Sequence, residues 1–322
     1  MRLNQIRDFV SIVEAGSIRA AARAQGVTHP SMTKSLRQLE DDLRVQLIRR
    51  STRGVVPTPS GRAFLVRARA IQAEVRKAEE ELRGLAGEAG GTVSISVSPA
   101  AAALLAPDAI AEFLARHPQT RMRIVEGTPS ALVPLVRDET LDFALGNRPA
   151  AKIEAGLKFR VLLRTPMVVA GRRGHPLREA RSLRELADAR WIGLYPPGAG
   201  GMVERAFAAA ALPFPQRYIT CESHVFAFEL LARTDALMPL PAQLFAAPTI
   251  RRTLAEIPLD EPFPSMVLGM CSRADTRLSP LAAALARTVT EVAGRVARET
   301  RGAIMHAAEP RLAADAPQAA RR

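Results

Sequence analysis

The stretch SIRAAARAQGVTHPSMTKSLRQLE, residues 17–40, predicts two short helices joined by a tight turn. Ser17 is placed to cap the first helix, which is thin because it is rich in alanine, and Gly26-Val27 forms the turn. Thr28 is placed to cap the second helix, and Pro30 falls in its first turn, where a missing N–H costs no hydrogen bond. A thin helix that lets a second helix approach closely is typical of a helix-turn-helix unit.

The second helix of this pair has two different faces. Its apolar side chains recur at steps of 4, 3 and 4 residues: Met32, Leu36, Leu39 and Leu43. The opposite face carries polar and basic residues: Pro30, Thr33, Lys34 and Arg37. A helix that packs through one face can present the other to the major groove of double-stranded DNA, although a solvated face is the alternative.

The flanking segments complete a small head. Residues 3–15 have the apolar spacing of a helix, and residues 47–58 alternate around Arg53-Gly54, which predicts a β-hairpin wing. Basic residues in a wing are placed to touch phosphates or a minor groove. His29 can donate to a base edge or a phosphate, and its alternative role is an uncharged first-turn residue. The predicted DNA contacts are Ser17, Thr28, His29, Pro30, Ser31, Thr33, Lys34, Arg37, Arg50, Thr52 and Arg53.

A long helix is predicted from Pro59 to about Leu85. Its apolar positions repeat every 3.5 residues over three heptads: Phe64, Ala68, Ile71, Val75, Ala78, Leu82 and Leu85. This period predicts a coiled-coil seam between two copies of the chain, and the alternative is a helix lying on its own domain's core. The expected organisation is therefore a head over 1–58, a linker helix over 59–86 and a glycine-rich hinge over 87–91.

The remainder of the chain changes to alternating strands and helices. This pattern predicts an α/β effector-binding domain over 92–300, made of two lobes joined by two crossovers. Lobe I covers about 92–163 and 266–300, and lobe II covers about 164–265. Residues 301–322 are rich in alanine and are expected to be a disordered tail.

The charge of the chain favours a polyanionic partner. Lys and Arg number 45 against 32 Asp and Glu, and the 13 basic and 5 acidic residues of 1–69 give that segment a net charge of +8. Such clustering favours nucleic acid over a membrane surface. The chain shows neither a long apolar run nor a signal-peptide pattern, so a cytoplasmic location is expected. Cys221 and Cys271 are interpreted as small buried apolar residues rather than a thiol sensor.

Several motifs resemble the LysR-type transcriptional regulator family over about residues 1–300. They are Glu14-Ala15-Gly16-Ser17, Ala20-Ala21-Ala22, the run from Gly26 to Ser31, Arg37-Gln38-Leu39-Glu40, Leu47-Ile48-Arg49-Arg50 and Thr58-Pro59-Ser60-Gly61. The resemblance implies a winged helix-turn-helix, a dimerising linker helix and a bilobed, periplasmic-binding-protein-like effector domain. It also implies tetramers that bind two DNA sites and change DNA bending with a small inducer.

Two positions depart from the family pattern. The usual Ser-Gln before the recognition-helix proline is Thr28-His29 here, so a Gln-type base contact is not carried over. Ala100 stands where a hydroxyl residue is frequent. Base reading is therefore expected to depend more on Thr33, Lys34 and Arg37.

The effector is expected to bind where strand ends meet helix N-termini. The free N–H groups there favour a carboxylate, a sulfonate or a similar anion, with Arg148 placed to pair with it. Each candidate can instead be an ordinary cap or turn residue. The predicted effector-binding residues are Ser98, Ala100, Thr128, Gly146, Asn147, Tyr195, His224 and Pro241.

Taken together, the sequence predicts an α/β multidomain, sequence-specific DNA-binding transcriptional regulator controlled by a small anionic inducer. It is expected to form a homodimer through the linker helix and a homotetramer beyond it. The chain shows no G-x-S-x-G, P-loop, dinucleotide-binding or zinc motif, so no enzyme activity, cofactor or metal is expected. The alternative is a solute-binding or enzymatic α/β protein with an accessory basic helical domain.

Overall fold

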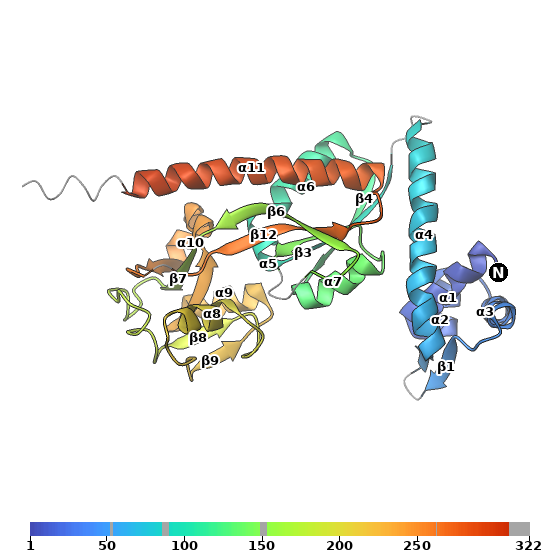
Figure 1. Cartoon of the computed structure of the whole chain (residues 1–322), viewed down its shortest axis with the longest axis horizontal. Coiled ribbons are helices and arrows are strands. Elements are labelled where there is room, and N and C mark those ends of the chain that lie inside the picture. Colours follow the sequence, from blue (N-terminus) through green and yellow to red (C-terminus); the bar gives the residue numbers. More distant parts are fainter. Residues whose placement is uncertain (52–53, 86–89, 149–152, 262, 309–322) are drawn as a thin grey trace, which may run out of the picture.

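The computed structural model describes residues 1–51, 54–85, 90–148, 153–261 and 263–308. A small N-terminal head and a larger α/β domain lie on either side of one long helix (Figure 1). The head consists of α1 (Leu3–Ala15), α2 (Ile18–Ala24), α3 (His29–Leu43) and the antiparallel pair β1 (Ile48–Ser51) and β2 (Gly54–Pro57). This is the winged helix-turn-helix that the sequence predicts.

Caps and a small core hold the head together. The Ser17 and Thr28 hydroxyls accept hydrogen bonds from the N–H groups of Ala20 and Ser31, so both act as N-caps. The core is fully buried and includes the apolar stripe of α3; its members include Phe9, Ile12, Ala21, Met32, Leu36, Leu39, Leu47 and Ala68. Gly61 lets the next helix approach the wing, because a Cβ there would lie 1.8 Å from the Leu47 carbonyl oxygen.

Helix α4 (Pro59–Leu85) connects the head to the α/β domain (Figure 1). Its first half packs on the head, since Phe64, Leu65, Ala68 and Ile71 join the head's core. Its second half presents apolar residues to solvent, with Ala78 exposed and Leu82 67% exposed. The first half of the helix therefore lies on its own domain's core, whereas a coiled-coil seam along the second half stays a prediction. The expected hinge lies largely outside the described residues.

Lobe I contains a five-stranded mixed sheet in the order β4-β3-β5-β12-β6. Its elements are β3 (Gly91–Val97), β4 (Thr120–Glu126), β5 (Phe143–Asn147), β6 (Leu157–Thr165), β12 (Met266–Arg273), α5 (Pro99–Leu104), α6 (Ala106–Arg116), α7 (Pro129–Arg137) and α11 (Pro280–Ala308). Helices α6 and α11 share one apolar core with the sheet, whereas α7 lies over a second cluster that contains Ala144 and Cys271.

Lobe II contains a second five-stranded sheet in the order β11-β7-β10-β8-β9. Its elements are β7 (Met167–Arg172), β8 (Arg190–Gly193), β9 (Tyr218–Thr220), β10 (Ala236–Pro241), β11 (Leu254–Ile257), α8 (Met202–Ala209), α9 (His224–Arg233), the 3-10 helix η1 (Ala242–Ala246) and α10 (Pro248–Thr253). The chain crosses between the lobes twice, from β6 to β7 and from β11 to β12. Cys221 and Cys271 are both buried, in different lobes.

Three local features differ from the sequence expectation. The sequence pattern predicts one helix after residue 98 that runs to Arg116, but the structure divides this segment at Leu105, where φ is −135° and Pro107 lies in a new first turn. Helix α10 and strand β11 were not expected, since their short apolar pattern carries no periodic signal. The tail expected from residue 301 is wrong for its first part, because α11 continues to Ala308 through residues that favour helix. Within the described residues, no helix is long and apolar enough to span a membrane.

Candidate functional site

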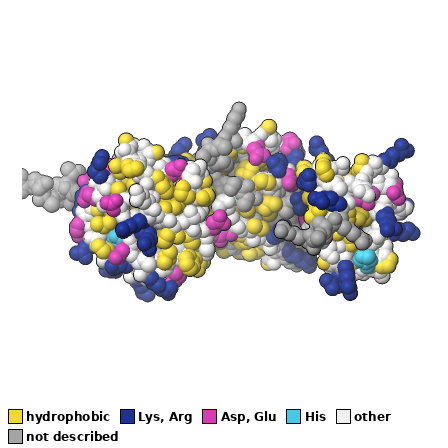
Figure 2. Space-filling view, turned by 90° about the horizontal axis from the view of Figure 1, so that it is seen from below, with side chains coloured by type: hydrophobic (Ala, Val, Ile, Leu, Met, Phe, Trp, Pro, Cys, Tyr) yellow, Lys and Arg dark blue, Asp and Glu magenta, His cyan; other side chains and the backbone are white. Residues whose placement is uncertain are grey.

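The outer face of α3 is the candidate DNA-reading surface. His29, Pro30, Ser31, Lys34 and Arg37 are all exposed there, while the opposite apolar stripe is buried. Lys and Arg side chains project from the head on several sides in Figure 2, where the head is at the right. The exposed face is thus free of packing duties and available for contact with a groove.

Three of the predicted DNA contacts have a structural duty as well. The hydroxyls of Ser17 and Thr28 are used as caps, and the Thr33 hydroxyl donates to the His29 carbonyl oxygen at 2.9 Å. A hydroxyl that donates to its own helix keeps its lone pairs as acceptors for a base amino group or an N–H. The side chains of Lys34 and Arg37 are exposed, and no hydrogen bond or ion pair to another described residue engages them.

The recognition helix is fixed in orientation by two polar contacts. The Ser35 hydroxyl donates to the buried Asp8 carboxylate at 2.5 Å, which joins α3 to α1. The Glu40 carboxylate accepts from the N–H groups of Leu47 at 2.7 Å and Ile48 at 3.2 Å, which joins α3 to the wing. Such charge-assisted bonds set the position of the wing relative to the reading face.

The wing is only partly described. Arg49 is exposed on β1 and pairs with Val56 across the hairpin, and the backbone of Arg50 pairs with Val55. The predicted contacts Thr52 and Arg53 lie outside the described residues.

The candidate effector site is a cavity of about 600 Å³ between the two lobes. Five of the eight predicted residues line it: Ala100, Asn147, Tyr195, His224 and Pro241. They come from both lobes, because α5 and β5 belong to lobe I while the chain after β8, α9 and β10 belong to lobe II. A ligand held by both sets would bridge the lobes.

The other three predicted effector residues are placed elsewhere. Ser98 is buried behind the cavity wall, where its hydroxyl caps α5 and lies 3.4 Å from the Asn147 side-chain oxygen. Gly146 packs against Ser98, since a Cβ on it would lie 3.2 Å from the Ser98 Cβ. Thr128 precedes α7 and does not line the cavity. The sequence pattern locates strand ends correctly but cannot tell which side chains turn inward.

The cavity wall is mainly apolar, with few charges. Apolar lining that sequence reasoning missed comes from α7, β7, β8, α9, β10 and β12, and includes Val133, Met167, Ile192, Phe228, Met238, Leu240 and Met266. Arg148 and Arg205 are the cations among the described lining residues, and Glu154 is an acid at the same wall. Arg205 gave no sequence signal, because a lone arginine on α8 reads as a solvated helix position.

Burial changes the ionisation of two lining groups. It lowers the pKa of His224 to about 4, so the imidazole is neutral near pH 7. Its Nδ1 atom is buried and has no hydrogen-bond partner among the described residues. Burial, with a smaller effect of Glu204, raises the pKa of Tyr218 to about 12, and this hydroxyl donates to the Tyr195 carbonyl oxygen at 2.9 Å. The site therefore offers neutral hydrogen-bonding groups beside its arginines.

This arrangement, a winged head and a bilobed α/β domain with an internal cavity, defines a class of ligand-responsive DNA-binding regulators. Comparison with known proteins gives the same result. The family model described as LysR substrate binding domain matches residues 86–294, and the model described as bacterial regulatory helix-turn-helix protein, lysR family, matches residues 3–62. The chain belongs to the LysR family of transcriptional regulators, which combine DNA binding with an effector-binding domain.

Named relatives are transcriptional regulators rather than enzymes. HTH-type transcriptional regulator GalR of Pseudomonas putida is 29% identical over 293 residues, which are 89% of this chain and 73% of that protein. PcaQ of Agrobacterium fabrum is 28% identical over 92% of this chain and 96% of its own length. GbpR of Azospirillum brasilense is 30% identical over 87% and 83% respectively. A solute-binding or enzymatic protein is therefore not favoured.

Solved structures show the same fold over nearly the whole chain. Full-length OxyR from Pseudomonas aeruginosa superposes with a TM-score of 0.68 at 22% identity, covering 92% of this chain and 97% of that one. CbnR, a LysR family transcriptional regulator, gives a TM-score of 0.64 at 20% identity, covering 91% and 99%. CbnR complexed with its target DNA gives 0.63.

Proposed function

We propose that α3 reads an operator in the major groove through Thr33, Lys34 and Arg37, with His29, Pro30 and Ser31 at its first turn. Ser17, Thr28 and the wing residues Arg50, Thr52 and Arg53 would contact the flanking phosphates. The observation that carries this proposal is the exposure of the α3 face above an opposite stripe that is buried at Met32, Leu36 and Leu39 and partly buried at Leu43. Backbone phosphate contacts supply affinity, and the α3 side chains supply sequence discrimination.

Dimerisation through the second half of α4 is the next part of the proposal. Val75, Ala78 and Leu82 lie on one side of the helix, opposite Ala73 and Glu80, which are buried toward lobe I. A large exposed leucine in heptad register favours burial against a second copy of the same helix. Two heads on paired α4 helices would bind a roughly two-fold symmetric site, and a tetramer would engage two such sites.

The inducer is a small anion with an apolar body, bound in the inter-lobe cavity. The support is the combination of an apolar wall with Arg148 and Arg205 and with polar groups on Asn147, Tyr195 and His224. An inducer that binds one arrangement of the lobes more tightly than the other shifts the equilibrium between them, by an amount set by the ratio of the two affinities. This shift changes the spacing of the heads and hence the DNA bend.

The experiment is an operator mobility shift with the promoter of the neighbouring divergent gene, at moderate salt and with unrelated competitor DNA. A screen of aromatic and short-chain carboxylates by thermal shift supplies the inducer for the second step. Arg148→Gln is expected to weaken binding of that inducer about tenfold, whereas Arg164→Gln, an exposed β6 variant away from the cavity, keeps it. Absence of a specific operator complex, or equal inducer affinity in both variants, would contradict the corresponding step.

A further inference from the structure

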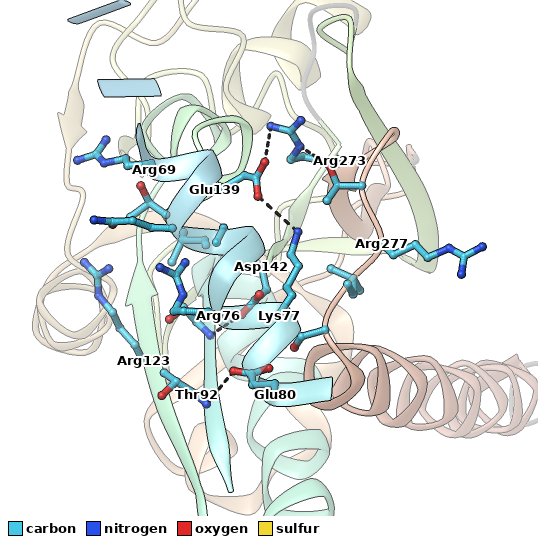
Figure 3. Close-up of a pocket in the computed structure, with 18 of the residues that line it drawn as sticks. Arg69, Arg76, Lys77, Glu80, Thr92, Arg123, Glu139, Asp142, Arg273 and Arg277 are labelled. Carbon is cyan, nitrogen blue, oxygen red and sulfur yellow. Dashed lines mark hydrogen bonds and ion pairs between the residues drawn. The ribbon is translucent and has the colours of Figure 1, made fainter. Parts of the chain in front are cut away.

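A second, polar pocket of about 260 Å³ lies between α4 and lobe I (Figure 3). Its walls come from α1 and α4, from β3 and β4, from the segment between α7 and β5, and from the end of β12 with the loop that follows it. None of its lining residues lines the inter-lobe cavity. It is also on the side of α4 opposite Leu82, so pairing of two α4 helices through Leu82 would leave it open.

Cations outnumber acids around this pocket. Its charged lining consists of six cations, Arg69, Arg76, Lys77, Arg123, Arg273 and Arg277, and four acids, Glu14, Glu80, Glu139 and Asp142. Glu139 pairs with both Lys77 at 3.4 Å and Arg273 at 3.1 Å, and Glu14 pairs with Arg69 at 3.2 Å. These pairs account for three of the six cations.

Two of the remaining cations have no direct partner in the part of the chain that the structure describes. Among the described residues, no ion pair or hydrogen bond engages the guanidinium of Arg76 or Arg123. The charge of Arg76 acts on Asp142 only as a lesser effect that opposes the raised pKa of that carboxyl. The Nε atom of Arg69 is buried and likewise has no acceptor among the described residues. In Figure 3 the side chains of Arg69, Arg76 and Arg123 extend to the same side of the pocket, while Arg277 points away from it.

The neighbouring carboxylates do not accept hydrogen bonds from these unpaired N–H groups. Asp142 accepts from the N–H of Ser94 at 2.7 Å, and Glu80 accepts from the N–H of Thr92 at 3.3 Å. Both carboxylates are therefore directed to the backbone of β3 rather than to Arg69 or Arg123. Glu14 lies at the far end, toward the head, where it is held by Arg69.

We propose that Arg69, Arg76 and Arg123 form a binding site for a small anion with two or more negative charges, a phosphate or a short dicarboxylate. Guanidinium groups match both oxygens of such anions bidentately, and an anion supplies acceptors for Arg76, for Arg123 and for the Nε atom of Arg69, whose Nη2 atom is already paired with Glu14. The pocket is less than half the volume of the inter-lobe cavity, which restricts the ligand to a small, strongly charged molecule.

The position of the site gives it a regulatory role. Arg69 and Arg76 belong to the helix that carries the head, whereas Arg123 belongs to β4 at the edge of the lobe I sheet. An anion held by all three links the head-bearing helix to the effector domain. It is thus a second input that changes operator affinity without occupying the inter-lobe cavity.

The test is calorimetric titration of the full-length, DNA-free protein with inorganic pyrophosphate and, separately, with succinate. We expect saturable binding of at least one probe, and the probe that binds more tightly identifies the phosphate or the dicarboxylate class. The double variant Arg76→Gln/Arg123→Gln is expected to lose at least tenfold in affinity. The control Arg67→Gln/Arg121→Gln removes the same charge from exposed positions on the same two elements, outside the pocket, and is expected to keep wild-type affinity.

The outcomes are distinguishable from those for the inter-lobe site. Equal affinity in the two double variants, or no saturable binding of either probe to the wild type, overturns the proposal. Arg148→Gln, which alters the inter-lobe cavity, is expected to leave probe binding unchanged. Saturating probe should change operator affinity at least threefold in the wild type and not in Arg76→Gln/Arg123→Gln. A bound probe with no such change overturns the regulatory role.

Discussion

The carboxylate of Glu80, near the end of α4, accepts a hydrogen bond from the backbone N–H of Thr92 in the first strand of lobe I, at 3.3 Å (Figure 3). The second oxygen of Glu80 is buried without a partner among the described residues. Two positions along the same strand, Ser94 donates to Asp142 at 2.7 Å. The buried Glu80 and the half-buried Asp142 therefore link the head-bearing helix and the segment before β5 to the same strand.

The carboxyl group of Asp142 makes the stability of the protein dependent on pH. Burial, helped by the nearby charge of Glu80, raises the pKa of Asp142 from 3.8 to about 6, against the lowering effect of Ser94. Because the folded-state pKa lies above the unfolded one, folding takes up a proton between about pH 4 and pH 6, and stability falls as pH rises through this window. Relative to the wild type, Asp142→Asn should gain on the order of 1–3 kcal/mol in unfolding free energy between these pH values.

Thermal or urea unfolding of the wild type and Asp142→Asn at pH 4 to 7 measures this gain. Glu80→Gln should show the same direction with a smaller size, because it removes a secondary cause of the raised pKa while keeping an acceptor for Thr92. A wild-type-minus-variant difference that stays constant across the window would contradict the assignment.

The exposed leucine on α4 predicts an oligomerisation phenotype. Leu82→Gln should raise the dimer dissociation constant about tenfold or more, because 67% of this side chain is exposed in the protomer and the proposed pairing of α4 helices would bury it. Glu81→Gln, at the next exposed position, should leave it unchanged. Sedimentation velocity over a concentration series measures both. Identical dissociation constants for the two variants would place the dimer contact elsewhere.

The exposed face of α3 predicts how two substitutions change operator binding. Arg37→Ala should weaken operator binding by roughly 1–3 kcal/mol and relax discrimination between operator and mutated sites, as expected of a base contact. Lys34→Ala should also relax discrimination, because the proposal places this side chain among the base-reading groups, and the loss of its ammonium charge should reduce the salt dependence by about one counterion. Arg67→Ala, at an exposed position on α4, is the control. Fluorescence anisotropy at several salt concentrations separates these cases, and an unchanged Arg37→Ala affinity removes that residue from the reading face.

Local sequence signals were sufficient to predict the helices of the head, but they did not identify all the residues that line the inter-lobe cavity. Caps at Ser17 and Thr28 and a strict apolar stripe act within a few residues, so the helix bounds of the head follow from the sequence almost directly. The inward turn of side chains in the cavity depends on long-range packing. Ser98 looked like a ligand contact, yet it is buried as a cap beside Gly146.

The role of α4 shows the same limit. One 3.5-residue period covers both halves of the helix, but only the three-dimensional packing separates Phe64, which lies on the head, from Leu82, which faces solvent. The polar pocket beside α4 could not be predicted from the sequence. Arg76 and Arg123 are 47 positions apart and read individually as solvated charges.

The imidazole of His224 predicts a pH dependence opposite to that of Asp142. Burial lowers its pKa from 6.5 to about 4, so folding releases a proton between these values and stability falls as pH falls through them. His224→Gln should therefore be more stable relative to the wild type at pH 4.5 than at pH 7.5, by on the order of 1–2 kcal/mol after allowance for the ring's remaining exposure.

Urea unfolding of both proteins at the two pH values measures this difference, and an equal difference at both would contradict it. The His224 and Asp142 windows overlap with opposite slopes, so the two effects partly cancel in the wild type. Each single variant should expose the slope of the remaining group.

An anion bound beside His224 stabilises the charged ring, so inducer binding to the wild type near pH 5.5 should take up protons, and binding to His224→Gln should take up fewer. Titration calorimetry in two buffers of different ionisation heat measures that uptake, and equal uptake by both proteins would place the anion away from His224.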